Sequence, residues 1–411
     1  MLFTVLYVIS SVILSLFTGR RWLFLWVALF RQPRPANEPM TKANVLVVVP
    51  FYNESQVLPR CLQAISQLAY PVERLAVLLV DDGSTDDSGR VAQTFAASHP
   101  HWATLRLPTN AGKAAALNSA IRHCPHVPFL VVYDADERPQ PDSLRHLLSG
   151  FLDERVGGVT GRRVISNGLN SAAATYATYE NLVHQYITCQ AKDTLHLYPP
   201  LLGSNCAYRL TALTSVGGFR PGATLEDSDL TVRLAQAGWH TRYLPQAIST
   251  TRAPETLAGY VAQHRRWAKG FAEVAHEEFR VSSSEFRVRS SRFRVSGFRL
   301  GVGRVLARLE LFLFASGYLD RAALVVMMFA WLIQIRKSTP HAPRPTYPVL
   351  ILTLLTPLIQ IIAALWLERS AAAYWFRLLL LPFFFLLDIT TTSLGIGQSL
   401  LGIMLGMKRR D

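Results

Sequence analysis

The sequence predicts an α/β domain with a mostly parallel sheet, flanked by transmembrane helices at both ends of the chain. Three observations support this fold class. Strand-length apolar runs alternate with helical patterns over residues 44–275, long apolar segments lie on either side, and charged residues are scarce. Half of the 411 residues are hydrophobic and 17% are charged, against about 25% in a typical soluble protein. The length itself favours two or more structural units.

The N-terminal segment is interpreted as a membrane anchor. Residues 2–18 carry no charge and approach the length of about 20 residues that spans a bilayer. A signal peptide would have a basic start and an Ala-x-Ala-like cleavage site, and neither is present. Residues 1–43 are therefore expected to form a retained anchor and a basic linker. The basic residues Arg20, Arg21, Arg31, Arg34 and Lys42 follow the anchor and place its C-terminal side in the cytoplasm. Residues 22–30 are a shorter apolar run, which either rests in the membrane interface or begins a second span.

The central region has the rhythm of a βαβ protein. The expected strands are residues 44–51, 75–80, 103–107 and 127–133. The expected helices between them are residues 54–68, 86–98 and 112–123. Such alternation with buried strands is typical of a mostly parallel sheet, whose ligands bind at the carboxyl ends of the strands. Polar residues gather at these ends, at Asn53-Glu54, Asp81-Asp82 and Asp134-x-Asp136. One binding site is therefore expected there.

A short basic segment, residues 276–308, contains an internal repeat. Phe-Arg-Val recurs at residues 279, 286 and 293, and the spacing fits both a strand and a helix. One interpretation is a cytosolic segment that touches anionic headgroups. The alternative is a tandem-repeat loop without a function of its own.

The C-terminal region, residues 309–411, is expected to cross the membrane. Residues 347–367 form the clearest span. Residues 311–335 contain Asp320-Arg321, which indicates an interfacial helix running into a span or a helix that faces protein. Residues 371–407 are too long for one span. The basic Lys408-Arg409-Arg410 is expected in the cytoplasm, so the number of C-terminal spans must be even. Four are expected, with two as the alternative.

Composition also narrows the class of partner. The net charge of +14 suits nucleic acid, anionic lipid or phosphorylated small molecules. The apolar ends and the absence of aromatic–basic interleaving argue against nucleic acid. The spans carry few polar residues, which argues against a channel or transporter. The four cysteines, without metal-ligand spacing, are interpreted as reduced thiols facing a cytoplasm; they are Cys61, Cys124, Cys189 and Cys206.

Two motifs at predicted strand ends and one at the start of a predicted helix suit a nucleotide or another phosphorylated ligand. Asp134-Ala135-Asp136 places two carboxylates where they can hold a hard divalent cation, which in turn bridges phosphates. Asp81-Asp82-Gly83-Ser84 suits a turn and a helix cap, and it also offers a carboxylate to a base or a ribose. Gly112-Lys113 places a lysine at the start of a helix, where anions are favoured.

Two further motifs lie on predicted helices. Three acids, Glu226, Asp227 and Asp229, open one helix. Their mutual repulsion predicts a raised pKa in one of them, as a general base requires. Gln263, Arg266 and Trp267 share the face of a second helix. Either this helix lies at a membrane surface, or the arginine contacts a diphosphate and the tryptophan stacks on a sugar.

In this order the motifs resemble those of the family 2 membrane glycosyltransferases, which include the synthases of cellulose, hyaluronan, chitin and poly-N-acetylglucosamine. The motifs are Val49-Pro50-Phe51-Tyr52-Asn53-Glu54, Asp81-Asp82-Gly83-Ser84, Gly112-Lys113, Asp134-Ala135-Asp136, Glu226-Asp227 and Gln263-x-x-Arg266-Trp267. The resemblance covers residues 44–270. It implies a GT-A type nucleotide-sugar-binding domain over residues 44–275, on the cytoplasmic side of a multi-pass protein, with a bacterial plasma membrane as the expected location.

The resemblance also implies a role for each matched residue. The residues that would hold a UDP-sugar are Tyr52, Glu54, Asp82, Lys113, Asp134, Gln263 and Arg266. Those that would meet the acceptor are Trp267 and, in a loop that resembles the acceptor side, Gly203, Ser204 and Asn205. Asp136 would ligate Mg²⁺ or Mn²⁺, and Asp227 would be the catalytic base.

The expected function is therefore an inverting, metal-dependent transfer from a UDP-sugar to a growing β-linked polysaccharide. The alternative is a glycolipid synthase that glycosylates diacylglycerol, ceramide or another membrane lipid. Gln-x-x-Arg-Trp occurs in both groups and does not separate them. Membrane lipids are expected partners in either case, and nucleic acid is not. The sequence identifies neither the sugar nor any accessory subunit.

Overall fold

The computed structural model describes residues 2–35, 38–124, 126–285, 300–336 and 347–404. The chain forms two compact units, each assembled from segments that are distant in sequence. The sheet unit comprises residues Gln32–Gly168 and Lys192–Ala253. The helical unit comprises Met1–Arg31, Leu169–Ala191 and Pro254–Asp411.

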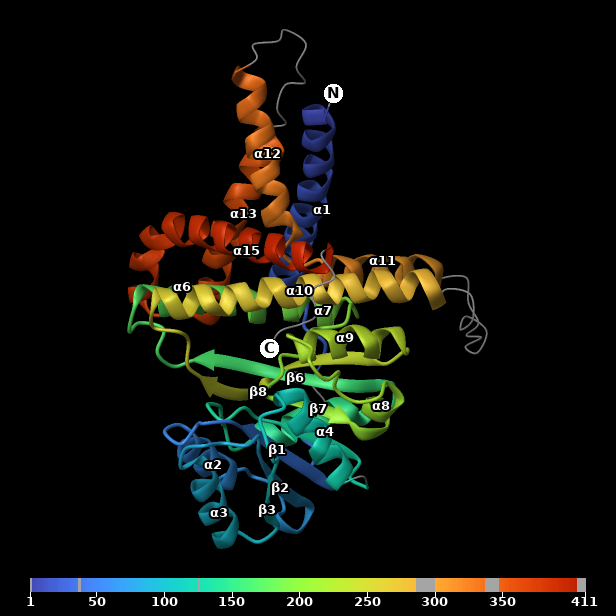
Figure 1. Cartoon of the computed structure of the whole chain (residues 1–411), viewed down its shortest axis with the longest axis vertical. Coiled ribbons are helices and arrows are strands. Elements are labelled where there is room, and N and C mark those ends of the chain that lie inside the picture. Colours follow the sequence, from blue (N-terminus) through green and yellow to red (C-terminus); the bar gives the residue numbers. More distant parts are fainter. Residues whose placement is uncertain (1, 36–37, 125, 286–299, 337–346, 405–411) are drawn as a thin grey trace. The chain divides into compact units, whose positions relative to one another are not determined.

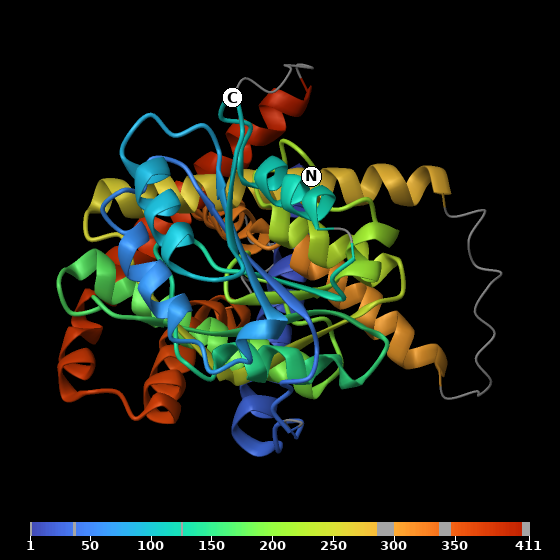
Figure 2. The same cartoon turned by 90° about the horizontal axis from the view of Figure 1, so that it is seen from below.

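The sheet unit is built on an eight-stranded sheet with the strand order β3-β2-β1-β4-β7-β6-β8-β5, seen from below in Figure 2. The strands are β1 Val45–Phe51, β2 Leu75–Asp81, β3 Trp102–Arg106, β4 Phe129–Val132, β5 Arg138–Pro139, β6 Val156–Ile165, β7 Cys206–Arg209 and β8 His240–Thr251. Strands β1 to β4 are parallel to their neighbours, and β6 is parallel to β8. The predicted strands and their parallel pairing are confirmed. Because β7 is antiparallel to both β4 and β6, the complete sheet is mixed.

Helices cover both faces of this sheet, which explains the uninterrupted apolar strands. The helices and short 3₁₀ turns of the unit are α2 Leu58–Ser66, η1 Val72–Arg74, α3 Ser88–Ser98, α4 Lys113–His123, α5 Ser143–Ser149, η2 Gly150–Leu152, α8 Leu210–Ser215 and α9 Glu226–Gln236. Alternate residues of a strand point to opposite faces. Val47 of β1 accordingly packs in a core with Leu62 of α2, and Val48 packs in a second core with Leu117 of α4. The three predicted helices are present as shorter segments, α2, α3 and α4.

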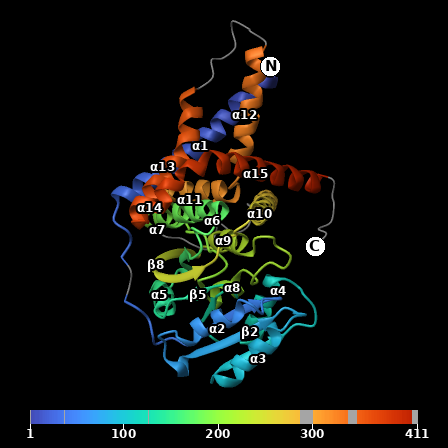
Figure 3. The same ribbon diagram turned by 90° about the vertical axis from the view of Figure 1, so that its left-hand side faces the viewer.

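The helical unit combines long helices in two directions. Its elements are α1 Leu2–Phe30, α6 Ala172–Leu182, η3 Val183–Cys189, α7 Gln190–Thr194, α10 Leu257–Glu285, α11 Leu300–Ala315, α12 Leu319–Arg336, α13 Tyr347–Glu368, α14 Ala372–Phe376, η4 Arg377–Leu380 and α15 Leu381–Met404. Figures 1 and 3 show α1, α12 and α13 alongside one another, whereas α10, α11 and α15 run across them. The hydroxyls of Thr18 on α1 and Thr353 on α13 lie 2.9 Å apart. Trp22 donates to Thr356 one turn further on, so α1 and α13 run in the same direction.

Among the described residues, three helices are long and apolar enough to cross a membrane: Thr4–Phe30, Pro348–Glu368 and Ala372–Ser399. A fourth candidate is the pair Val305–Ala315 and Leu319–Ala330, which is bent by 71°. The apolar run at residues 22–30 is continuous with α1 and is not a separate element. Among the described residues, the C-terminal region thus has two candidate spans, or three with the bent pair, whereas the sequence led to an expectation of four with two as the alternative. Residues 381–404, within the segment judged too long for one span, form one helix.

The charged pair in the C-terminal region is explained by its partners. Arg21 of α1 lies 2.5 Å from Asp320. Arg321 lies 3.2 Å from Asp388 of α15. Charges inside an apolar layer are costly unless they face protein and are paired. Of the two interpretations of this segment, the contacts support a helix that faces protein at Asp320-Arg321. A bend of 71° precedes this pair, between α11 and α12.

The segments of the two units alternate along the sequence, whereas the expected domains were contiguous. Helices α6 and α10 were expected inside the domain of residues 44–275, but they belong to the helical unit. Aromatic contacts account for this, because Tyr176 of α6 stacks on Phe384 of α15 with ring centroids 5.0 Å apart. The first repeat copy, at residues 279–281, lies in α10 and is helical. The copies at residues 286 and 293 lie outside the described residues.

Candidate functional site

Lys113 is the centre of a charged cluster in the sheet unit. It opens α4, directly after Gly112, whose φ of 85° suits glycine. Its Nζ lies 2.6 Å from Asp134 Oδ1 and 3.3 Å from Glu226 Oε1, and it donates to the Gly203 carbonyl at 3.1 Å. Burial lowers the pKa of Lys113, but the two carboxylates more than offset this and hold it above its ordinary value. The lysine therefore joins the end of β4, the start of α9 and the loop before β7.

Asp227 is the carboxylate of this cluster whose pKa is raised. Burial and the adjacent Glu226 raise its pKa to about 7, although Lys113 acts in the opposite direction. Its Oδ1 accepts a hydrogen bond of 2.6 Å from the Ser228 amide. This agrees with the expectation that one acid at the start of α9 has a raised pKa. A carboxylate that titrates near neutrality has the proton affinity that general-base catalysis requires.

The loop of residues 203–205 contributes backbone to the site. Gly203 has a φ of 73°, and a Cβ there would lie 3.0 Å from Asp227 Oδ2 and 3.2 Å from Lys113 Nζ. Glycine is thus required for the backbone to approach both groups. Ser204 and Asn205 are fully buried. Ser204 accepts a hydrogen bond from the Asp134 amide at 2.8 Å, and the Asn205 amide donates to the Ala247 carbonyl at 2.8 Å. Their side chains hold the loop in place.

A group of carboxylates follows β4. Asp136 accepts a hydrogen bond of 3.1 Å from the Thr251 hydroxyl. Burial, followed by the charges of Asp136 and Asp134, raises the pKa of Glu54. Carboxylate oxygens are the ligands that hard divalent cations prefer. Asp134, Asp136 and Glu54 place such oxygens near one another, and Asp134 is also paired with Lys113.

The end of β2 supports the lysine loop. Asp82 is buried, and its two carboxylate oxygens accept hydrogen bonds from the amides of Ala111 at 2.9 Å and Gly112 at 2.8 Å. The sequence resemblance assigns Asp82 to the uridine. In the structure the carboxylate fixes the loop that precedes Lys113. Tyr52, at the end of β1, is 41% exposed and available to a ligand.

Two residues of the site escaped the sequence analysis. Glu137 is fully buried, its Oε1 lies 2.5 Å from Arg163 Nε, and its Oε2 accepts from the Ser249 hydroxyl. This contact ties the turn after Asp136 to β6 and β8. The only sequence signal for Glu137 is that it is a third acid directly after Asp-x-Asp. No local feature of the sequence marks Arg163. A buried pair of this kind is strongly destabilising to break.

The remaining predicted residues, Gln263, Arg266 and Trp267, lie on α10 of the helical unit. Their spacing in a helix is confirmed. Arg266 is exposed, and Trp267 is half-buried with its ring centroid 4.9 Å from that of His264.

The mixed sheet, with acidic residues at the ends of its parallel strands, is a GT-A type fold. The family described as Glycosyltransferase like family 2 matches residues 43–270, and the chain belongs to this family.

Curated relatives cover the same region. The chain is 30% identical over 231 residues to the probable glycosyltransferase YdaM of Bacillus subtilis (strain 168), over 55% of each protein. It is 32% identical over 254 residues to an N-acetylglucosaminyltransferase of Rhizobium meliloti (strain 1021), over 58% of each. It is 29% identical over 249 residues to the probable glucomannan 4-beta-mannosyltransferase 1 of Arabidopsis thaliana, over 58% of this chain and 44% of that protein. The chain thus matches about half the length of these relatives.

Among solved structures, the mannosyltransferase PcManGT from Pyrobaculum calidifontis, in complex with GDP-Man and Mn²⁺, has a similar fold. The TM-score is 0.59 at 22% sequence identity, with 87% of this chain and 97% of that chain covered. The similarity supports the fold assignment.

Proposed function

We propose that this family 2 glycosyltransferase is an inverting, metal-dependent enzyme that moves a sugar from a UDP-sugar to a growing β-linked polysaccharide. The observation that carries the proposal is Asp227, a carboxylate with a pKa of about 7 beside Lys113 and the Gly203 backbone. A general base and a cation beside a glycine backbone are parts that this transfer needs.

In the proposed reaction Asp227 takes the proton of an acceptor hydroxyl. The acceptor oxygen then attacks the anomeric carbon from the face opposite the nucleotide, so that an α-linked donor gives a β-linkage. Lys113 stabilises the negative charge that develops on the leaving diphosphate. We further propose that Gln263 and Arg266 contact the diphosphate and that Trp267 stacks on the acceptor.

We assign the metal to the carboxylates after β4. Asp136 would hold Mg²⁺ or Mn²⁺, with Asp134 and Glu54 as the neighbouring acids. When bound, the ion neutralises charge on the diphosphate. The Mn²⁺ in the PcManGT complex supports a metal at this type of fold.

A second donor has specific support. The PcManGT structure contains GDP-Man, and a curated relative of the chain is a probable glucomannan 4-beta-mannosyltransferase. GDP-mannose is therefore the alternative to a UDP-sugar. Transfer to a membrane lipid remains the alternative to a polysaccharide product.

Membranes that contain the protein are expected to incorporate label from a UDP-sugar into a polymer. The experiment supplies radiolabelled UDP-glucose, UDP-N-acetylglucosamine and GDP-mannose in parallel, followed by partition into chloroform. Label that dissolves in neither solvent indicates a polymer, because a glycolipid would enter the organic phase. Membranes with Asp227→Asn protein are the control. Incorporation from GDP-mannose alone would contradict the proposal that the donor is a UDP-sugar. Label in the organic phase would contradict the proposal that the acceptor is a polysaccharide.

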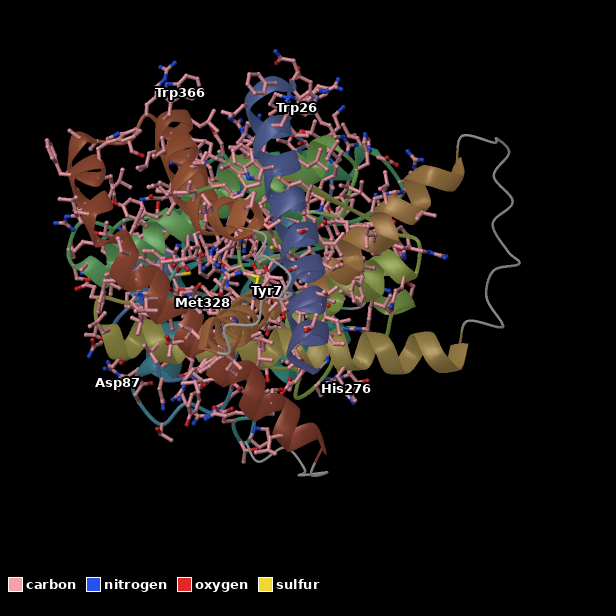
Figure 4. The ribbon with its side chains drawn as sticks, turned by 90° about the horizontal axis from the view of Figure 1, so that it is seen from above. Tyr7, Trp26, Asp87, His276, Met328 and Trp366 are labelled. Atoms are coloured by element: carbon pink, nitrogen blue, oxygen red, sulfur yellow. The ribbon has the colours of Figure 1, made fainter. Side chains whose placement is uncertain are left out.

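We infer a membrane topology from the helical unit itself. Helices α1 and α13 run in the same direction, and α12 runs against them, since Arg21 meets Asp320 while Ser11 meets Met327. Trp26 and Trp366, at the C-terminal ends of α1 and α13, are 48% and 67% exposed (Figure 4), as expected at a membrane interface. Helix α15 belongs to a segment long and apolar enough to cross a membrane, but it packs along α10, with Gly395 against Ala268. We therefore propose three spans, α1, α12 and α13, with the sheet unit in the cytoplasm.

Reporter fusions test this topology. Green fluorescent protein joined after Gln67 or Glu368 should fluoresce, and alkaline phosphatase at the same positions should be inactive, because both sites would be cytoplasmic. A phosphatase fusion after Arg336, at the end of α12, should be active and serves as the matched control. Active phosphatase after Gln67 would show that the orientation is opposite to the proposed one. The sheet unit would then have no access to cytosolic donors.

A further inference from the structure

The helical unit contains a buried cluster of three potential metal ligands that the proposed reaction does not use. Glu180 comes from α6, His264 from α10 and Asp388 from α15, and one ligand atom of each lies within 4.8 Å of the others. His264 and Asp388 are each only 1% exposed. Three helices distant in sequence thus converge on one point.

The hydrogen bonds of His264 place its Nε2 opposite the Glu180 carboxylate, an arrangement that requires a proton or a metal ion between them. Nδ1 lies 2.9 Å from the Tyr260 carbonyl, which can only accept, so Nδ1 carries the hydrogen. Nε2 of a neutral ring then has a lone pair. It nevertheless lies 3.0 Å from Glu180 Oε2 and 3.2 Å from Oε1. Lone pairs on both sides repel unless a proton or a metal ion lies between them.

Asp388 supplies a second, independent observation. Its Oδ2 accepts from Arg321 Nε at 3.2 Å. Its Oδ1 is buried and has no hydrogen-bond partner in the described structure. A buried oxygen without a partner is costly. Double protonation of His264 would pair it with Glu180 but would do nothing for Asp388, whereas a metal ion could bind all three side chains.

We propose that Glu180, His264 and Asp388 bind a divalent transition metal, with Zn²⁺ as the best match. Zinc is held by imidazole nitrogen and carboxylate oxygen at about 2.0–2.2 Å, so neighbouring ligand atoms of a tetrahedral site are about 3.3–3.6 Å apart. The distance between His264 Nε2 and Glu180 Oε2 is 3.0 Å, so the two side chains would separate slightly when the ion binds. Mg²⁺ prefers an all-oxygen octahedron and is disfavoured. The Tyr260 carbonyl on Nδ1 is the outer-shell partner that metal-bound histidines usually have.

The site would fix α10 to α6 and α15. His264 stands between Gln263 and Arg266 in sequence, on the buried side of α10, whereas Arg266 is exposed. We therefore give His264 a positioning role for the helix that carries these residues. The site is separate from the carboxylates after β4, and binding is measured without a substrate, so its test is independent of the proposed function.

The test is a zinc titration of the full-length protein, purified in detergent without a histidine tag and stripped with a chelator. Calorimetry should show one tight equivalent per chain that Asp136→Asn retains. His264→Gln and Asp388→Asn should each weaken it by at least about 100-fold, more than outer-shell changes cost. His276→Gln, an exposed histidine on the same helix (Figure 4), is the matched control and should bind as the wild type does.

The absorption spectrum of Co²⁺ bound to the wild-type protein tests the proposal even if a variant fails to fold. Co²⁺ added to the wild-type protein should give visible ligand-field bands of a low-symmetry nitrogen and oxygen site, and added Zn²⁺ should abolish them. A wild-type protein that binds neither ion would overturn the proposal in favour of a protonated His264. Folded His264→Gln and Asp388→Asn proteins that bind zinc as tightly as the wild type would also overturn it.

Discussion

Asp227→Asn is expected to lower the rate of sugar transfer by about 10²–10⁴, the usual contribution of a general base, while donor affinity stays near the wild-type value. The amide has the same shape as the carboxylate and can still accept the hydrogen bond from Ser228, but it cannot take up the acceptor proton. Transfer rates on purified protein, beside calorimetric titration with the nucleotide, measure the two effects separately.

Asp142→Asn is the matched control for this change. It makes the same substitution in the sheet unit at a half-exposed position, where Asp142 pairs with Arg145 three residues later. Such surface pairs contribute little to stability, and both transfer and binding should be unchanged. If nucleotide affinity of Asp227→Asn falls in step with activity, the residue is structural and the assignment as base is wrong.

The pH profile gives a second measurement on the same residue. The base must be ionised, so kcat/KM should fall as the pH drops below the pKa of Asp227, which is about 7. Glu226 raises this pKa and Lys113 lowers it. Glu226→Gln should therefore move the acid limb of the profile to lower pH. An acid limb that stays in place would exclude Asp227 as the group that titrates.

The first half of the sheet could be predicted because its signal is local. Strands β1 and β4 are uniformly buried, and a strand with helices on both faces must be apolar along its whole length. The polar residues that follow each strand then have to meet at one edge of the sheet. This is why Glu54, Asp82, Asp134 and Asp136 could be expected at one edge of the sheet from the sequence, whereas Lys113 was assigned only through the family resemblance.

The parts that escaped prediction depend on partners distant in sequence. Helix α6 joins the helical unit through Tyr176, whose stacking partner Phe384 lies more than two hundred residues away. Glu137 meets Arg163 across the turn after Asp136, and nothing local marks either residue as a pair. Gly203 was assigned through the family resemblance, but its closeness to Asp227 is visible only in the folded chain, where a Cβ at this position would lie 3.0 Å from Asp227 Oδ2.

Asp136→Asn is expected to abolish metal-dependent transfer, with a loss of at least about 10²–10³, as is typical when an electrostatic stabiliser of the transition state is removed. The substitution keeps the side-chain volume and an acceptor for Thr251 but removes the charge that binds a divalent cation. Chelation of metal from the wild-type enzyme should cause a similar loss, reversed by Mn²⁺ or Mg²⁺. The measurement is the transfer rate over a series of metal concentrations, beside nucleotide binding with and without metal.

Asp87→Asn is the control, because Asp87 is exposed and pairs only with Arg90 on the surface (Figure 4). It should leave the metal dependence unchanged. The Asp136→Asn protein should retain the nucleotide affinity that the wild type shows without metal, because Lys113 still offers its positive charge to the diphosphate. It should also keep the zinc equivalent proposed for the helical unit, which separates the two metal sites. A variant with the wild-type rate at every metal concentration would refute Asp136 as the ligand and leave Glu54 and Asp134 as the remaining acids at that edge of the sheet.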